Sequence, residues 1–434
     1  MAVLLSHDEP DFEARFRALA LAKRDSDAGV DADVAAIIAD VRTRGLDCVL
    51  ELTRRFDRWA ASPDTLAFTE AEIDAALARV EPDQLTALEL AAERIRAYHQ
   101  RQLPQDAEWE DESGVRLGWR WRAVGAAGLY VPGGTAAYPS SVLMNAVTAK
   151  VAGVERLEMC VPTPDGHAND LVLCAARLAG IDRIWRIGGA QAIAAMAYGA
   201  GPIRPVDVIT GPGNAYVAAA KRQVFGHVGI DMIAGPSEVL VIADADNDPD
   251  WIAIDLLAQA EHDPTAQAIC ITDDARFADA VRIAVDRRLQ AMARAEIAGR
   301  SWRAHGGIIV ARDLDHAAAL ADGVAPEHLE ISCADAEGLA GKIRNAGAIF
   351  LGAYTPEAIG DYVGGPNHVL PTAGSARFAS GLSVLAFMKR TTLTRASAAG
   401  LAAIGPAAAT LADAEGLEAH AASVRARLVP STGR

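Results

Sequence analysis

The chain has 434 residues, of which 51 % are apolar, and a chain of this length usually holds roughly two to four domains. Its 57 acidic and 41 basic residues leave a formal net charge of −16, which argues against nucleic acid as its main partner. The start, MAVLLSHDEPDFEARF, has neither the basic segment nor the long apolar run of a signal peptide. No stretch offers the about 20 strongly apolar residues that span a bilayer. We therefore expect a cytoplasmic protein with no membrane partner.

The N-terminal part of the chain carries helical periodicity. Residues 10–24 and 30–45 repeat apolar side chains at three- and four-residue spacing, and a longer helical pattern runs from Thr69 to about Gln102. From about Leu117 onward, short apolar runs alternate with helical stretches, which is typical of βαβ units on a parallel sheet. The expected strands lie in GLYV, RLEMCVP, RIWRIG, PVDVITG, SEVLVIAD, AQAICITDD, GGIIVA, LEISC and AIFLG.

The dinucleotide-binding pattern G-x-G-x-x-G is absent, and its nearest approach is GPGNAY, where Tyr216 takes the place of the third glycine. The sequence thus predicts an α/β protein with two tandem Rossmann-like α/β domains that lack this loop and meet near Gly235 and Pro236. Helical segments are expected at both ends. The expected boundaries are 1–25 for an N-terminal helical segment, 26–127 with 238–382 for one α/β domain, 128–237 for the other and 383–434 for a C-terminal helical tail.

The stretch AQAEHDP holds a first candidate site on a predicted helix. Asp248 and Pro249 favour a helix start, and Asp263 before Pro264 favours its end. Gln259 and His262 then project together about one turn apart. Histidine is a common metal ligand, but glutamine brings only an uncharged oxygen, so the spacing leaves both a metal site and a solvated helix end open.

Two later stretches offer acid–base groups. APEHLEIS places Glu327 beside His328 before a strand, a pair suited to proton transfer. IGDYVGGPNHVLPT holds Asp361 and His368 around a Gly-Gly-Pro-Asn loop, whose backbone we expect to be open to approach. Ligands of open α/β sheets bind at the carboxyl ends of strands, where we expect this machinery to lie.

Weaker signals come from isolated polar groups. Tyr130, Gln191 and Asn214 stand near strand-to-helix junctions, where helix N-termini can hold anions, although turn chemistry explains the glycines and prolines equally well. Ser237 stands where the two units join. In the tail, AEGLEAHAASVRAR carries Glu415 and His420 on an amphipathic helix, a pattern typical of surface or core. The five cysteines, widely spaced and odd in number, are predicted to be buried, inert thiols.

Taken together, seven segments closely resemble the histidinol dehydrogenase family. They are GLYVPGGTAAYPSSVLMNAVTAKVAGV, TGPGNAYVAAAKRQV, DMIAGPSEVLVIAD, LAQAEHDP, APEHLEI, DYVGGPNHVLPT and EGLEAHAASV, in the order that the family has them. The resemblance implies oxidation of L-histidinol to L-histidine through L-histidinal, with two NAD and one zinc ion per active site. It also implies a homodimer in which each tail completes the partner's site.

The resemblance implies roles for individual residues. Glu327 would activate water, and His328 would act as general base. The zinc ligands would be Gln259, His262, Asp361 and, from the partner subunit's tail, His420. Ser237, His368 and Glu415 would contact the substrate, together with His328 and the four ligands. Tyr130, Gln191 and Asn214 would contact NAD.

The residues suit this chemistry. An imidazole has a pKa near working pH, so His328 can take the proton that an alcohol or a gem-diol loses as hydride leaves. Substrate nitrogen atoms suit zinc, which would orient the substrate. Two alternatives stay open: a related zinc- and NAD-dependent dehydrogenase for another small alcohol, and a zinc hydrolase that uses Glu327 as base.

Overall fold

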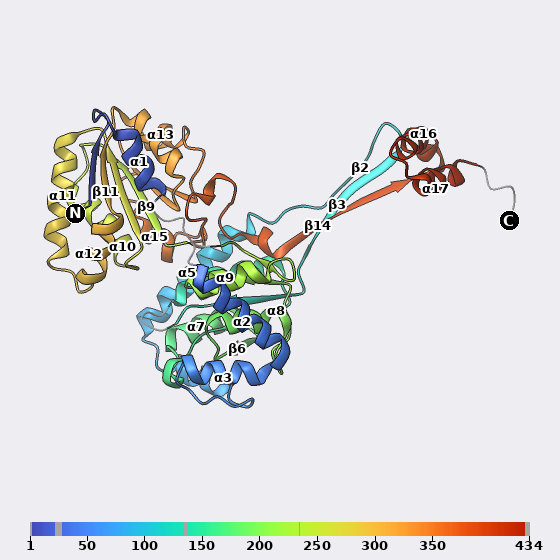
Figure 1. Cartoon of the computed structure of the whole chain (residues 1–434), viewed down its shortest axis with the longest axis horizontal. Coiled ribbons are helices and arrows are strands. Elements are labelled where there is room, and N and C mark those ends of the chain that lie inside the picture. Colours follow the sequence, from blue (N-terminus) through green and yellow to red (C-terminus); the bar gives the residue numbers. More distant parts are fainter. Residues whose placement is uncertain (1, 22–27, 134–137, 234, 430–434) are drawn as a thin grey trace.

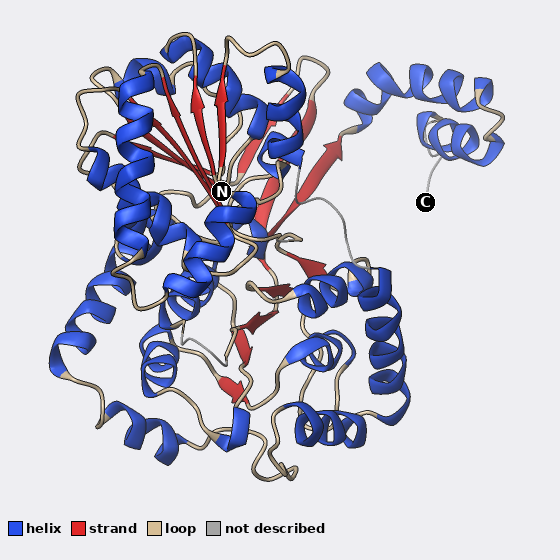
Figure 2. Cartoon of the chain, turned by 60° about the vertical axis from the view of Figure 1, so that its left-hand side comes forward, coloured by secondary structure: helices blue, strands red, loops and turns tan. Residues whose placement is uncertain are grey.

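The computed structural model describes residues 2–21, 28–133, 138–233 and 235–429. Two parallel sheets, each covered by helices on both faces, form the body, and a three-stranded antiparallel ribbon carries a helical hairpin away from it (Figure 1; Figure 2). The predicted α/β class is confirmed, and all nine strands expected from the sequence are present. No helix among the described residues is long and apolar enough to cross a membrane.

The first sheet has six strands, all paired in parallel. In spatial order they are β1 (Val3–Ser6), β11 (Gly307–Val310), β10 (Gln267–Thr272), β9 (Glu238–Ala243), β12 (His328–Ser332) and β13 (Ala348–Leu351). Because successive strand side chains point to opposite faces, β9 sends Leu240 and Ile242 into one core and Val239 and Val241 into the other.

Helices cover both faces of this sheet. One core is built with α1 (Phe12–Leu21), α13 (Leu314–Val324) and α14 (Ala336–Ala340), and the other with α10 (Pro249–Ala260), α11 (Ala275–Leu289) and α12 (Ala295–His305). The short helix α15 (Glu357–Tyr362) follows β13. As predicted, α10 starts after Asp248, whose side chain accepts a hydrogen bond from the Asp250 amide.

The second sheet has five parallel strands: β6 (Arg183–Trp185), β5 (Arg156–Cys160), β4 (Ala126–Tyr130), β7 (Val208–Thr210) and β8 (Gly229–Ile230). One face packs on α2 (Ala28–Arg44), α3 (Leu46–Phe56), α8 (Gly189–Tyr198) and α9 (Ala215–Val224). The other face packs on α4 (Glu70–Leu77), α5 (Pro82–Gln100), α6 (Pro139–Ala152) and α7 (Asp170–Ala179).

The elements of the N-terminal third belong to other sheets than the predicted domain boundaries assign them to. Strand β1 pairs with β11, so the start of the chain completes the six-stranded sheet and is no separate helical segment. Residues 1 and 22–25 of that predicted segment lie outside the described residues. Helices α2 to α5 bury their apolar faces on the five-stranded sheet, whereas the sequence grouped residues 26–127 with 238–382. The long pattern from Thr69 is two helices, because Pro82 starts a new one.

The predicted helical tail begins instead with a strand. After the turns η2 (Ser375–Arg377) and η3 (Val384–Phe387), β14 (Met388–Ala396) pairs antiparallel with β3 (Val115–Ala123), whose other edge carries β2 (Ala107–Glu110). This ribbon leads to α16 (Ala398–Ala414) and α17 (Glu418–Leu428) (Figure 1). Nearly all residues of β14 are exposed, so its sequence lacks the alternation of apolar and polar residues that predicts a strand. A short turn, η1 (Pro164–Gly166), precedes α7.

Candidate functional site

The predicted acid–base pair lies at the start of a strand. Helix α13 ends at Val324, Ala325 adopts a left-handed conformation with φ 51°, and β12 begins at His328. Glu327 and His328 therefore sit at the amino edge of the six-stranded sheet. The expectation that they would lie at carboxyl ends of strands is wrong, because the helix-to-strand turn before β12 delivers them to the opposite edge.

His328 is buried and held in one orientation. Its Nδ1 lies 3.0 Å from the carbonyl oxygen of Glu238 and 3.4 Å from Oε1 of Glu357. Because a carbonyl only accepts, Nδ1 carries the proton in the neutral ring and Nε2 keeps its lone pair. Within the described part of the chain, Nε2 has no hydrogen-bond partner and lies 3.9 Å from Oδ1 of Asp361. Burial lowers the pKa of His328, so the ring is a neutral base.

The Glu327 carboxylate is fixed beside this ring. Its Oε2 accepts a hydrogen bond of 2.8 Å from the Glu238 amide and lies 3.8 Å from Nδ1 of His328. The side chain is almost fully buried. The carboxylate therefore has a defined orientation at the amino end of β9, next to Ser237, which directly precedes that strand.

Asp361 and His368 lie together across the Gly-Gly-Pro-Asn loop. Nδ1 of His368 is 3.0 Å from the backbone oxygen of Asp361 and 3.8 Å from its Oδ1. Nε2 of His368 is 3.2 Å from the hydroxyl of Ser141 in the first turn of α6. Since α6 follows β4, this contact joins the amino edge of the six-stranded sheet to the carboxyl edge of the five-stranded one.

The loop itself is fixed by its neighbours. Arg94 of α5 donates to the carbonyls of Val363 and, at 3.1 Å, Gly364. The Asn367 amide donates to the Met144 carbonyl at 2.8 Å and is buried. The group that approaches the backbone of the Gly-Gly-Pro-Asn loop is therefore the Arg94 guanidinium of the same chain. These contacts fix the loop, and the fixed loop holds His368 in place.

Gln259 has the environment of a ligand. It is fully buried at the end of α10, and neither its Oε1 nor its Nε2 has a hydrogen-bond partner among the described residues. An unpaired buried amide costs free energy, so a partner such as a metal ion would relieve it. Burial is the main cause that lowers the pKa of His328 and of His368, and a positive charge on His262, exposed just past α10, would lower both further.

Three carboxyl groups at this site, the buried Glu330 and Glu357 and the half-buried Asp255, escaped the sequence analysis as functional candidates. Burial, then Asp361 and Glu330, raises the pKa of Glu357 well above its usual value. Burial and the adjacent Asp255 raise the pKa of Glu330 to about 8, and burial raises that of Asp255 to about 6. Glu357 precedes Asp361 by four residues on α15, so this helical spacing could have revealed it.

These groups surround a space suited to a cation. His328, Glu357 and Asp361 each offer one ligand atom, and these atoms lie within 4.8 Å of one another. Of the four predicted zinc ligands, Asp361 belongs to this cluster, and His262 is near enough to act electrostatically on His328 and His368. The high density of carboxyl groups and the unpaired Gln259 amide fit a divalent cation.

The predicted NAD contacts meet at the carboxyl edge of the five-stranded sheet. Tyr130 ends β4, and its hydroxyl accepts a 3.1 Å hydrogen bond from the amide of Gly189 at the start of α8. Gln191, also buried, is two residues further along α8. Asn214 caps α9 through hydrogen bonds from Tyr216 and Val217. Burial raises the pKa of Tyr130 to about 12, so its hydroxyl stays protonated.

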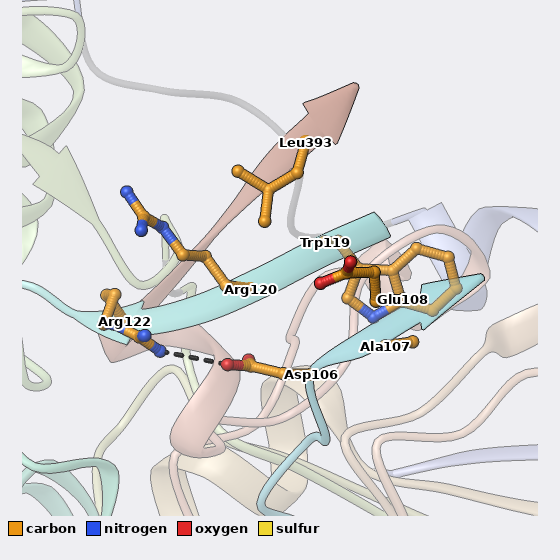
Figure 3. A pocket seen from close by; sticks show the side chains of 7 residues that line it. All are labelled: Asp106, Ala107, Glu108, Trp119, Arg120, Arg122 and Leu393. Atoms are coloured by element: carbon orange, nitrogen blue, oxygen red, sulfur yellow. Dashed lines mark hydrogen bonds and ion pairs between the residues drawn. The ribbon is translucent and has the colours of Figure 1, made fainter. Parts of the chain in front are cut away.

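Glu415 and His420 lie on the helical hairpin, away from the body (Figure 1). They line a hollow of about 420 Å³ with Leu411, Leu417 and other hairpin residues. A second hollow, of about 310 Å³, lies on the ribbon between Trp119, Leu393 and the Arg122–Asp106 ion pair (Figure 3). Within one chain, these two residues lie apart from His328, Asp361 and His368, which contact one another.

The cysteine prediction holds for most of the set. Cys48, Cys160, Cys174 and Cys270 are buried, and burial raises the pKa of each thiol. Cys333 is only half-buried, because it follows the last residue of β12, although its pKa is raised as well. All five are free thiols.

The fold and the site define a two-domain α/β enzyme. Its buried acid–base centre lies where the edges of the two sheets face each other. The family model of histidinol dehydrogenase matches residues 21–428. Histidinol dehydrogenases of Ruegeria pomeroyi and Cereibacter sphaeroides are each 65 % identical over 428 residues, which is 99 % of this chain and 99 % of each relative. A crystal structure of histidinol dehydrogenase from Elizabethkingia anophelis has a TM-score of 0.93 at 34 % identity and covers 98 % of both chains. The chain belongs to the histidinol dehydrogenase family and is an oxidoreductase. Residues 134–137, within the first resembling segment, lie outside the described part.

Proposed function

We propose that this chain catalyses the four-electron oxidation of L-histidinol to L-histidine through L-histidinal, the final step of histidine biosynthesis. The observation that carries the proposal is the buried His328 ring, whose Nε2 is unprotonated, unpartnered among the described residues and aimed toward Asp361. Such a ring can remove the hydroxyl proton of an alcohol that is oxidised beside it. Family membership supplies the substrate. A cytoplasmic location, as for other amino-acid biosynthesis, stays a prediction.

Four proton transfers are required of the protein. His328 takes the hydroxyl proton of histidinol at Nε2 as the first hydride leaves. Glu327, oriented by the Glu238 amide, then takes a proton from the water that adds to the aldehyde carbon. His328 returns its first proton to the aldehyde oxygen, which completes the gem-diol, and then takes a proton from a diol hydroxyl as the second hydride leaves. Two NAD molecules, bound in turn, would accept the two hydrides. Burial favours the neutral form of Glu357, but a proton on His328 favours its ionised form, which would then stabilise the imidazolium through Nδ1.

Zinc is the metal that we propose for the cation space, held by Gln259, His262, Asp361 and the partner's His420. It would supply an electrophilic anchor that orients the amino alcohol and imidazole of the substrate. Ser237, His368 and Glu415 would complete the substrate contacts. A neutral ligand such as Gln259 suits an orienting site, which does not need strong charge donation.

We further propose a homodimer with shared sites. The hairpin of α16 and α17 buries few side chains, among them Ala409 and Ala421, while Leu411 and Leu417 are 65 % and 42 % exposed. Two helices alone cannot form a core, so this apolar surface needs a partner. A second copy would cover it and receive Glu415 and His420 at its own acid–base centre.

For NAD, the proposed contacts are Tyr130, Gln191 and Asn214. They surround the N-termini of α8 and α9, where backbone amides and helix dipoles favour phosphate groups. The Ser141–His368 contact joins the two sheet edges, which supports a position of the proposed NAD surface beside the proposed substrate site.

The experiment that tests the proposal is a zinc-loaded assay with histidinol and NAD. It should yield two NADH for each histidine formed. A panel of small alcohols decides between histidinol and another alcohol as the preferred substrate. Histidinol oxidised no faster than the other alcohols would contradict the substrate assignment, and the absence of any NAD-dependent turnover would favour a zinc hydrolase.

A further inference from the structure

One buried ion pair in the five-stranded domain takes no part in the proposed chemistry. Lys221 of α9 and Asp231, which follows β8, form an ion pair with side chains only 3 % and 1 % exposed. Both also bind the backbone of Gly211: Lys221 Nζ donates to its carbonyl at 3.0 Å, and its amide donates to Oδ2 of Asp231 at 2.8 Å. We propose that Lys221 and Asp231 are positioning residues that hold the Gly211–Asn214 loop in the conformation that binds NAD. This inference rests on the proposed function.

Gly211, which the ion pair binds, stands at a position that only glycine can occupy. Gly211 directly follows β7 and has φ 115°. A Cβ there would lie 2.0 Å from the carbonyl oxygen of Tyr130. The loop therefore crosses directly against the end of β4, and the backbones that carry Tyr130 and Asn214 are in contact. Any shift of Gly211 would change the distance between these two proposed NAD contacts.

The start of α9 depends on the same loop. Asn214, three residues after Gly211, uses its Oδ1 to accept from the amides of Tyr216 at 3.1 Å and Val217 at 3.2 Å. Its Nδ2 group is then the part left to donate to a ligand. Because α9 carries both Asn214 at its cap and Lys221 in its last turn, the ion pair ties the far end of this helix back to its own N-terminal loop.

Stability alone does not account for such a pair. Removing two charges from water costs free energy that their attraction barely offsets, so apolar residues of similar volume often stabilise a protein equally well. The two groups meet both polar atoms of one glycine, which an apolar pair could not do. Orientation of the loop is the property that the ion pair supplies and an apolar replacement would lose.

The test uses the full-length zinc-loaded enzyme and a double variant, Lys221→Met with Asp231→Leu, which fills the space without charge. We expect the KM and the dissociation constant for NAD to rise by about tenfold or more, with kcat within about threefold of the unaltered enzyme. The KM for histidinol and the zinc content should not change. Hydrogen exchange of the peptide amides of residues 208–224 should become faster.

A matched control is available in the same domain. Glu158, 2 % exposed, pairs with Arg156 and accepts from the Trp185 indole, away from the loop. Glu158→Gln should lower thermal stability but leave NAD binding and loop exchange unchanged. Unchanged NAD affinity in the double variant would overturn the inference, as would an equal loss in the control. If instead the proposed function is wrong, the unaltered enzyme will form no NADH from histidinol. In that case, direct titration of the double variant and of the unaltered enzyme with NAD still tests the role of the ion pair. If the unaltered enzyme does not bind NAD, both the proposed function and this inference are overturned.

Discussion

Oε1 of Glu357 lies 3.4 Å from Nδ1 of His328, on the side of the imidazole ring opposite to the nitrogen that we assign as the base. Both side chains are almost fully buried. Burial raises the pKa of Glu357 while the ring is neutral, whereas a positive charge on the ring favours the ionised form of Glu357. The ionised group then stabilises the ring's charged form, which arises each time His328 takes a proton from the substrate.

Replacing Glu357 with glutamine should therefore slow the reaction more than it weakens binding. We expect kcat to fall by about tenfold to a hundredfold, as for groups that orient a reacting residue, with the KM for histidinol little changed. Steady-state kinetics and zinc analysis measure this. Glu330→Gln is the matched control, since Glu330 is equally buried but its partners are the Glu357 backbone amide and the Asp255 side chain. A KM effect alone, or loss of zinc, would show that Glu357 binds and does not orient.

Glu327→Gln should separate the two halves of the reaction. The amide can still accept from the Glu238 amide, so the fold is kept, but it cannot take a proton from water. Oxidation of supplied histidinal should fall by about a hundredfold or more, within the range for general base catalysis. Measuring NADH formation from histidinal checks this, and full-rate oxidation of histidinal would refute the role of Glu327.

Metal removal should abolish activity and point to the ligands. Dialysis against a chelator should stop NADH formation, and added zinc should restore it. Gln259→Ala should reduce bound zinc to well below one per chain, because it deletes a fully buried amide that has no other hydrogen bond in the described part of the chain. Elemental analysis decides the outcome. Equal zinc content in Gln259→Ala and the unaltered enzyme would exclude Gln259 as a ligand.

The shared site predicts complementation. His420→Asn and His262→Asn should each be inactive, because each lacks one zinc ligand. If the hairpin of one subunit completes the site of its partner, a mixed dimer contains one site with neither substitution. Mixing the two variants under conditions of subunit exchange should thus restore up to about a quarter of the activity, since half of the dimers are mixed and each has one intact site of two. No recovery despite proven exchange would place His420 in its own chain's site or outside any site.

The buried acids predict a pH-dependent stability. An unfolded glutamate has a pKa of 4.5, whereas burial beside Asp255 raises the pKa of Glu330 to about 8. Between these pH values the folded state holds more protons than the unfolded state, so the free energy of unfolding falls as pH rises. Glu330→Gln should therefore raise the melting temperature more at pH 8.5 than at pH 6, by several degrees at most. Thermal unfolding at both pH values measures this, and an equal change at both would contradict it.

The chain's local patterns were sufficient for the parallel strands and most helices of the body. SEVLVIAD and AQAICITDD are uninterrupted apolar runs because both faces of their sheet are covered, and they became β9 and β10. The sequence predicts helix where strand β14 lies, because the exposed residues of this strand carry no burial pattern and its partner β3 is more than 250 residues away. The domain boundaries failed for the same reason, since helical periodicity does not say which sheet a helix will cover.

By itself, the sequence determined the α/β class and the family, because periodicity, turn residues and ordered segments are local properties of the chain. The tertiary structure alone decided that Glu327 and His328 stand at the amino edge of a sheet, and that Glu357 backs the ring. It also placed Lys221 and Asp231 on both polar atoms of Gly211. Distances, burial and the resulting pKa shifts depend on which distant segments pack together, and no local pattern encodes them.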